Sequence, residues 1–150
     1  MKSKGFTLIE LLVVIAIIGL LTTTAVVSLN SARLKSRDAR RISDIKQVQT
    51  ALEMWFNDNQ AYPDALVLDG TASIATTANV YMSKSPADPL NIGNYTYDYY
   101  PCKFNAVGGG YICGIGNTPV SSYQLIYNLE GTINGISGRA TATPGGIKNN

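Results

Sequence analysis

The amino-acid sequence predicts an α+β protein in which one long N-terminal helix, with a membrane-spanning first half, packs against a small antiparallel sheet. Three observations lead to this prediction. Residues 11–32 form a run of 22 uncharged and mostly apolar residues. An apolar stripe with helical spacing follows over residues 39–56. Two later segments, residues 95–99 and 123–129, alternate in the way that β-strands do.

The composition argues against most enzyme classes. Twelve Lys and Arg against ten Asp and Glu leave a net charge of +2, which gives no general reason to expect nucleic acid or an anionic membrane surface as a partner. The sequence contains no histidine, which removes Ser-His-Asp and Cys-His catalysis, His-ligated zinc and histidine pH switches. No nucleophile–base pair, glycine-rich phosphate loop or metal-ligand cluster is visible either. We therefore expect a protein that is not an enzyme and has no cofactor.

The apolar run is long enough to cross a bilayer, because a spanning helix needs roughly 20 mostly apolar residues. Glu10 lies near its start, although a carboxylate costs about 2–3 kcal/mol or more at the centre of a spanning helix and less near the interface. An acidic residue kept there is a functional hypothesis whose partner has to be named. The alternative is an ordinary secretory signal cut near Ala25, but the run is long for a signal and a small-residue cleavage site is hard to place.

The helix is expected to continue well beyond the membrane. Neither Pro nor Gly interrupts residues 20–60, and Pro63 follows. One continuous helix from about Phe6 to Asn59 would be about 80 Å long. Its first half is apolar on all sides, and its second half carries the stripe formed by Ala39, Ile42, Ile45, Val48, Leu52, Trp55 and Phe56.

Residues 4–15, KGFTLIELLVVI, resemble the class III signal of type IV pilins and type II secretion pseudopilins. In that family a prepilin peptidase cuts after the glycine, which is Gly5 here, and methylates the new N-terminal amine, which is that of Phe6. The matching glutamate, Glu10, is held to pair with the Phe6 amine of a neighbouring subunit during assembly. The fold implied by the resemblance is a pilin-like one.

The physical chemistry agrees with this resemblance. Glu10 lies four residues after Phe6, on the same helix face and one turn deeper. In a packed bundle, the ammonium group of a neighbour would offset the desolvation of Glu10 far better than lipid can. The chain is thus divided into a leader peptide (1–5), a membrane-spanning and assembly half-helix (6–32), an amphipathic half-helix (33–60) and a globular head (61–150).

The resemblance implies a structural subunit of a type IV pilus-like filament that polymerises through its apolar helix. The alternative is a major pseudopilin of a type II secretion system, and a solitary membrane-anchored binding module is a third interpretation. The implied partners are identical and related subunits, the prepilin peptidase, an assembly platform protein with its ATPase, and the inner or cytoplasmic membrane. The exported head would end in a surface pilus or a periplasmic pseudopilus.

Basic residues follow the membrane span. Arg33, Arg37 and Arg41 stand four apart on one helix face, where they could contact nucleic-acid phosphates. We favour a solvated face that is partly paired with Asp38 and Asp44 at helical spacing. The number of basic residues after the span would by itself place them in the cytoplasm, but the N-terminal signal is more specific.

The head is predicted to contain three or four antiparallel strands, drawn from the two alternating segments and from the residues on either side of a triple glycine at 108–110. Residues 64–89 are rich in Ala, Thr, Ser and Asp and are expected to form a surface loop, with a short helix near residues 77–82. Residues 138–150 are rich in Gly, Thr, Asn and Pro and are expected to be a loose tail.

Cys102 and Cys113 enclose ten residues around the triple glycine. In an exported domain such a pair predicts a disulfide that closes a hairpin, worth about 3 kcal/mol. Reactive thiols or a metal pair are less well supported, because no further Cys and no His would complete a site. A calcium site stays open, with Asp88 and Asp98 as the nearest oxygen donors, although no ligand spacing supports it.

Overall fold

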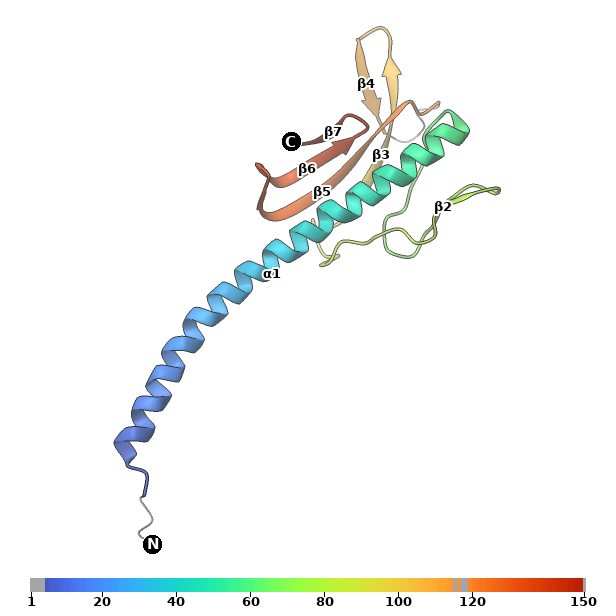
Figure 1. The fold of residues 1–150 in the computed structure, drawn as a ribbon. Coiled ribbons are helices and arrows are strands. Elements are labelled where there is room, and N and C mark those ends of the chain that lie inside the picture. The colour runs from blue at the N-terminus through green and yellow to red at the C-terminus, as the bar shows by residue number, and fades with distance from the viewer. Residues whose placement is uncertain (1–4, 115, 117–118, 150) are drawn as a thin grey trace.

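The computed structural model of the protein describes residues 5–114, 116 and 119–149 and shows a long helix that projects from a small head (Figure 1). The helix α1 (Leu8–Asn59) contains 52 residues and is continuous, which confirms the predicted single helix. Residues 1–4, which make up most of the predicted leader peptide, lie outside the described residues.

Both ends of α1 are capped. Thr7 is extended and serves as the N-cap, which is why the helix begins two residues later than the sequence predicts. At the other end Gln60 adopts a left-handed conformation with φ 58°, and its N–H donates to the carbonyl oxygen of Phe56 at 2.8 Å. Pro63 then follows, as expected for a chain that cannot continue the helix.

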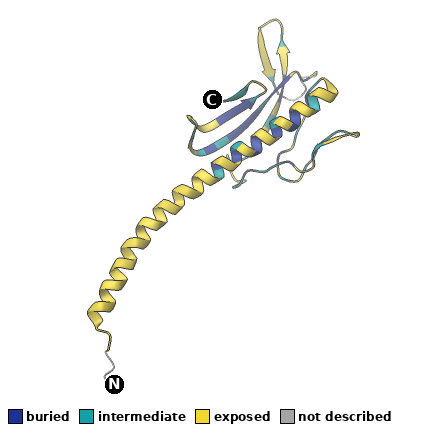
Figure 2. Ribbon diagram, viewed as in Figure 1, coloured by how far each residue is buried: buried dark blue, intermediate teal, exposed yellow. Residues whose placement is uncertain are grey.

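The two halves of α1 have different environments (Figure 2). Residues 8–36 are exposed on all sides, whereas the second half buries one face against the head. Ile45, Val48 and Leu52 are completely buried, so the predicted amphipathic stripe is confirmed over this stretch. Ala39 is exposed although the preceding Asp38 is buried, because Ala39 lies on the face of the helix that points away from the head.

Five antiparallel strands form the main sheet, where three or four were expected. They are β3 (Asp98–Asn105), β4 (Gly110–Cys113), β5 (Ser122–Ile133), β6 (Ile136–Thr143) and β7 (Gly146–Asn149). Their order is β4-β3-β5-β6-β7, so β4 and β7 are the edges of the sheet. The long strand β5 packs against the second half of α1.

The core lies between α1 and this sheet. Tyr123, Leu125, Tyr127 and Leu129 alternate along β5 and are all buried. Completely buried small residues of β6 pair with two of them, Ala142 with Leu125 and Ala140 with Tyr127.

The expectation of a loose C-terminal tail is wrong, because residues 136–149 form β6 and β7. A two-residue turn at Asn134-Gly135 returns the chain from β5 to β6. Both turn residues have positive φ, 52° and 78°, which a type I′ turn requires and an Asn-Gly pair favours. Composition misled the prediction, since the residues of β6 that pack in the core are alanines rather than large strand formers.

The expected short helix near residues 77–82 is also wrong. This region forms a small hairpin of β1 (Ile74–Ala75) and β2 (Val80–Met82), which lies on the other side of α1 from the main sheet (Figure 1). Thr76 stabilises the turn, because its N–H donates to the carbonyl of Asn79 at 2.8 Å and its hydroxyl accepts from the Asn79 N–H at 3.0 Å.

Candidate functional site: an exposed apolar helix joined to the head by a buried charge cluster

The predicted processing residues lie at the free end of the helix. Gly5 and Phe6 precede α1, and the Phe6 ring is exposed. Glu10 turns back onto Thr7, whose N–H and hydroxyl both donate to Glu10 Oε2, at 2.8 and 2.7 Å. The Glu10 N–H in turn donates to the Thr7 hydroxyl at 3.3 Å, which completes a capping box.

Sequence reasoning missed this role of Thr7, although a threonine three residues before a glutamate is the pattern of a capping box. In the single chain Glu10 therefore contacts Thr7 rather than the Phe6 nitrogen. Both bonds that it accepts from Thr7 go to Oε2, so Oε1 keeps acceptor capacity for a further donor. A carboxylate can thus cap its own helix and still receive a donor from another subunit.

The helix beyond this cap presents an apolar surface with no covering in the described chain. Its length and composition would allow it to cross a membrane as one helix. The three threonines within it satisfy their hydroxyls on the helix itself. Thr22, Thr23 and Thr24 donate to backbone carbonyls one turn earlier at 2.7, 2.7 and 2.9 Å. No polar group of these side chains is therefore left unpaired in an apolar surrounding.

A buried charge cluster marks the point where α1 meets the head. Arg41 is completely buried and donates to three carboxylates from different parts of the chain. Asp88 receives two bonds, from Nε at 2.7 Å and from Nη2 at 3.0 Å. Nη1 donates to Asp38 and to Glu130, each at 2.6 Å. The ring of Tyr95 lies 4.8 Å from the guanidinium carbon, so one cationic group joins α1, the loop before β3 and strand β5.

An irregularity in β5 completes the cluster. The pairing of β5 with β6 shifts register between Asn128 and Thr132. The N–H groups of Glu130 and Gly131 lie in this interval and donate to the carboxylate of Asp38, at 2.9 and 2.7 Å. The bulge thus turns two backbone donors of the sheet toward an acidic residue of the helix.

The electrostatics of the cluster favour the ionised form of these groups. The hydrogen bond from Arg37 lowers the pKa of Glu130 to about 2, and Arg41 adds to this effect. Burial is the largest single effect on both groups and by itself would lower the pKa of Arg41 and raise that of Asp88. The hydrogen bonds of Arg41 to all three carboxylates, and those that Asp88 accepts from Arg41 and from two backbone N–H groups, act together with the attraction between the charges and outweigh burial. The pKa of Arg41 is consequently raised and that of Asp88 lowered. Arg41, Asp88 and Glu130 are therefore charged at neutral pH.

The predicted solvated basic face is therefore wrong for two of its three arginines. Arg41 is buried and Arg37 pairs with Glu130, so neither presents a charge to a polyanion. Sequence reasoning could not find these partners, because Asp88 and Glu130 lie far from the helix along the chain. The helical pairing was foreseen in part, since Asp38 does pair with Arg41 and Asp44 pairs with the neighbouring Arg40.

The head carries the predicted disulfide and no recognisable metal centre among the described residues. Cys102 and Cys113 are directly opposite each other on β3 and β4 and are joined by a disulfide. Within residues 5–114, 116 and 119–149, no group of three His, Cys, Asp or Glu side chains is placed to hold a metal ion. Asp88, named above as a calcium donor, binds Arg41 instead, and Asp98 lies at the start of β3.

Comparisons with known proteins agree with this arrangement. The family described as prokaryotic N-terminal methylation motif matches residues 1–26. Type II secretion system core protein G of Escherichia coli strain K12 is 37% identical over 97 residues, which cover 59% of this chain and 67% of that protein. Core protein G of Vibrio cholerae serotype O1 is 30% identical over 141 residues, covering 82% of this chain and 97% of that protein.

A fimbrial protein, rather than a secretion protein, has a comparable sequence identity to this chain. The type IV major fimbrial protein FimA of Dichelobacter nodosus is 35% identical over 102 residues, which cover 65% of each chain. No solved structure matches the chain significantly. The N-terminal motif, the long apolar helix and these relatives lead to one conclusion: the chain belongs to the prepilin-type family of type IV pilins and type II secretion pseudopilins.

Proposed function

We propose that the protein is the structural subunit of a type IV pilus-like filament and has no catalytic activity or cofactor of its own. It would be made as a prepilin, cleaved after Gly5, methylated at the Phe6 amine and polymerised through the first half of α1. The observation that carries the proposal is the exposed apolar half-helix, which begins with a prepilin-type motif and projects from a folded head.

Two physical arguments support polymerisation through this helix. The apolar surface on residues 8–36 has to be covered by lipid before assembly and by other helices after it. Glu10 would then receive the methylated Phe6 amine of a neighbour on its Oε1 atom. This pairing would set the axial register between subunits, because an unpaired carboxylate is expensive in an apolar bundle.

A secretion pseudopilus is the second candidate, and the core protein G relatives favour it. In that case the same assembly would build a short periplasmic filament for protein secretion instead of a surface fibre. The platform protein, the ATPase and the peptidase proposed as partners would belong to the machine concerned.

The first experiment is intact mass and N-terminal analysis of the membrane-extracted protein, together with electron microscopy of sheared cell-surface material. The proposal requires a chain that begins at Phe6 and is heavier by one methyl group, and filaments that contain it. A chain that keeps Met1 would support a solitary anchored module, and a cut near Ala25 would mean a secreted head.

A strain that lacks the gene for this protein then distinguishes a surface pilus from a secretion pseudopilus. Loss of surface fibres with an unchanged set of exported proteins would assign a pilus. Loss of exported proteins, without any change in surface fibres, would assign a secretion pseudopilus.

A further inference from the structure

Large apolar side chains are exposed in two places on the head, separate from the apolar first half of α1. One is the hairpin of residues 102–113, called the arm here, where Phe104, Val107 and Tyr111 are 51%, 99% and 58% exposed. The other is a groove beside the last turns of α1, where Met54 and Val80 are 54% and 67% exposed. Apolar side chains gathered in this way mark interaction surfaces.

The arm is a projecting hairpin. It extends beyond the rest of the sheet (Figure 1), and its four paired positions give it a length of about 13 Å. The Cys102–Cys113 disulfide closes its base, and the rings of Phe104 and Tyr111 stack edge to face at 5.6 Å. The disulfide and the ring contact restrain the hairpin before a partner binds, which reduces the conformational entropy that binding would cost.

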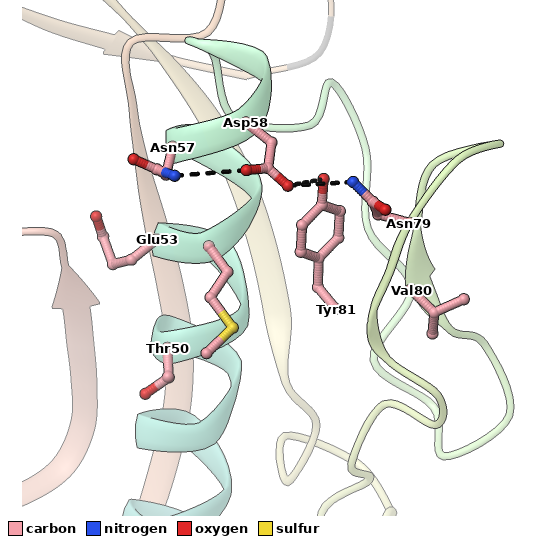
Figure 3. Close-up of a pocket in the computed structure, with 8 residues that line it drawn as sticks. Thr50, Glu53, Asn57, Asp58, Asn79, Val80 and Tyr81 are labelled. Atoms are coloured by element: carbon pink, nitrogen blue, oxygen red, sulfur yellow. Dashed lines mark hydrogen bonds between the residues drawn. The ribbon is translucent and has the colours of Figure 1, made fainter.

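The groove is lined by the apolar side chains of Met54 and Val80 among several polar ones, and two carboxylates give it uncompensated negative charge (Figure 3). It lies between α1 and strand β2, with a volume of about 620 Å³. Asp58 accepts from the Tyr81 hydroxyl at 3.0 Å, and Glu53 accepts from the Tyr62 hydroxyl at 3.1 Å. These donors are neutral, and among the described residues neither carboxylate forms an ion pair.

The arm is complementary to the groove in charge and in position. Lys103 is the one charged residue between Asp98 and Glu130 in the sequence, so the arm is cationic. Figure 1 shows the main sheet with the arm on one side of α1 and the β1–β2 hairpin, which borders the groove, on the other. Two different patches on opposite sides of a subunit make a heterologous contact, and such contacts generate open helical filaments.

We propose that the arm of one subunit inserts into the groove of the next copy of this chain. The apolar tip around Val107 would cover Met54 and Val80, while Lys103 would lie near Glu53 and Asp58. This inference rests on the proposed filament function and adds a contact between heads to the packing of the apolar helices.

The test is an oxidative cross-link in filaments of the full chain. Val80→Cys and Val107→Cys are introduced together, and sheared filaments are oxidised and separated on a non-reducing gel. We expect a ladder of covalent multimers. Each single variant should give no ladder, and Val107→Cys combined with Ile92→Cys, another exposed apolar position of the head, is the matched control.

A second variant checks the energetic role of the tip. Val107→Asp should lower the yield of filaments about tenfold while the cleaved, disulfide-bonded subunit accumulates normally. Val67→Asp is the control, since Val67 is also an exposed valine of the head, at 56%, but lies outside both surfaces.

The outcomes separate this contact from the filament itself. Filaments of the Val80→Cys/Val107→Cys variant that give no ladder would overturn the contact and leave the proposed function intact. If mass spectrometry identifies a different protein cross-linked to the arm, the proposal that the arm binds the groove of a second copy would be overturned. Absence of wild-type filaments would overturn both proposals.

Discussion

A guanidinium group that is completely buried needs acceptors for nearly all of its donors, and Arg41 has them in Asp38, Asp88 and Glu130. Such a cluster adds less to stability than its number of bonds indicates, because the desolvation of each charge opposes the attraction between them. Its value lies in specificity, since the helix and the head can meet in few other ways without leaving a charge unpaired.

Replacement of the Arg41 side chain should strongly lower the free energy of unfolding. Arg41→Met leaves three carboxylates close together with no cation at their centre, and we expect a loss of roughly 3–5 kcal/mol of unfolding free energy. Chemical denaturation of the full chain in detergent, followed by tyrosine and tryptophan fluorescence, measures it. Arg40→Met is the matched control, because the Arg40 side chain is 68% exposed, and it should change stability by less than about 1 kcal/mol. Equal effects of the two variants would refute this role of Arg41.

Acidification should also weaken the buried charge cluster between α1 and the head. The pKa of Glu130 falls from 4.5 to about 2 on folding, so its ionised form stabilises the fold above pH 4.5, and this contribution disappears as the pH drops toward 2. The melting temperature should therefore fall over this interval. Glu130→Gln should be less stable at pH 7 and lose less on acidification. A melting curve whose pH dependence is the same in both proteins would contradict the assignment.

At the scale of elements, β5 is the strand that organises the head. Its core face packs on α1, its bulge supplies two N–H donors to Asp38, and its Asn134-Gly135 turn leads into β6. The Asn-Gly pair is a strong local hairpin signal in the sequence. The bulge has no comparable signal, because it depends on where the helix presents a carboxylate.

Strand β6 carries a packing prediction. Ala142 is completely buried opposite Leu125, so Ala142→Leu has no room and should lose about 1–3 kcal/mol. Thermal unfolding followed by circular dichroism measures the change. Ala106→Leu introduces the same side chain at an exposed position and should be nearly neutral. If Ala142→Leu were equally neutral, the tail would be loosely attached after all.

At the scale of the whole molecule, the protein consists of a long apolar stalk and a head that is held to it by packing and by one charge cluster (Figure 2). The stalk has no partner within the described chain, which is the physical reason for expecting assembly. The head offers two lateral surfaces, the arm and the groove.

Assembly should depend on Glu10. Glu10→Ala removes the proposed acceptor of a neighbour's amine, so the chain should still be cleaved and methylated but filament yield should fall by at least about tenfold. Mass spectrometry of the membrane fraction and electron microscopy of sheared material give the two readouts. Asp64→Ala, at an exposed acidic residue of the head, is the control. Normal filament yield from Glu10→Ala would refute the role in register.

The sequence by itself determined what depends on near neighbours along the chain. The apolar run, the N-terminal motif, the helical stripe and the end of the helix near Pro63 all follow from spacing and composition within a few turns. The two cysteines enclose so short a loop that their disulfide could be predicted as well.

Only the tertiary structure decided what depends on distant partners. Arg41 meets Asp88 from 47 residues away, and Arg37 meets Glu130 from 93 residues away, so nothing local shows that these arginines are internal rather than solvated. The pairing of β6 with β7 and the positions of the arm and the groove were likewise decided only by the tertiary structure. The reason is physical: periodicity encodes which face of an element is buried, but not which other element will cover it.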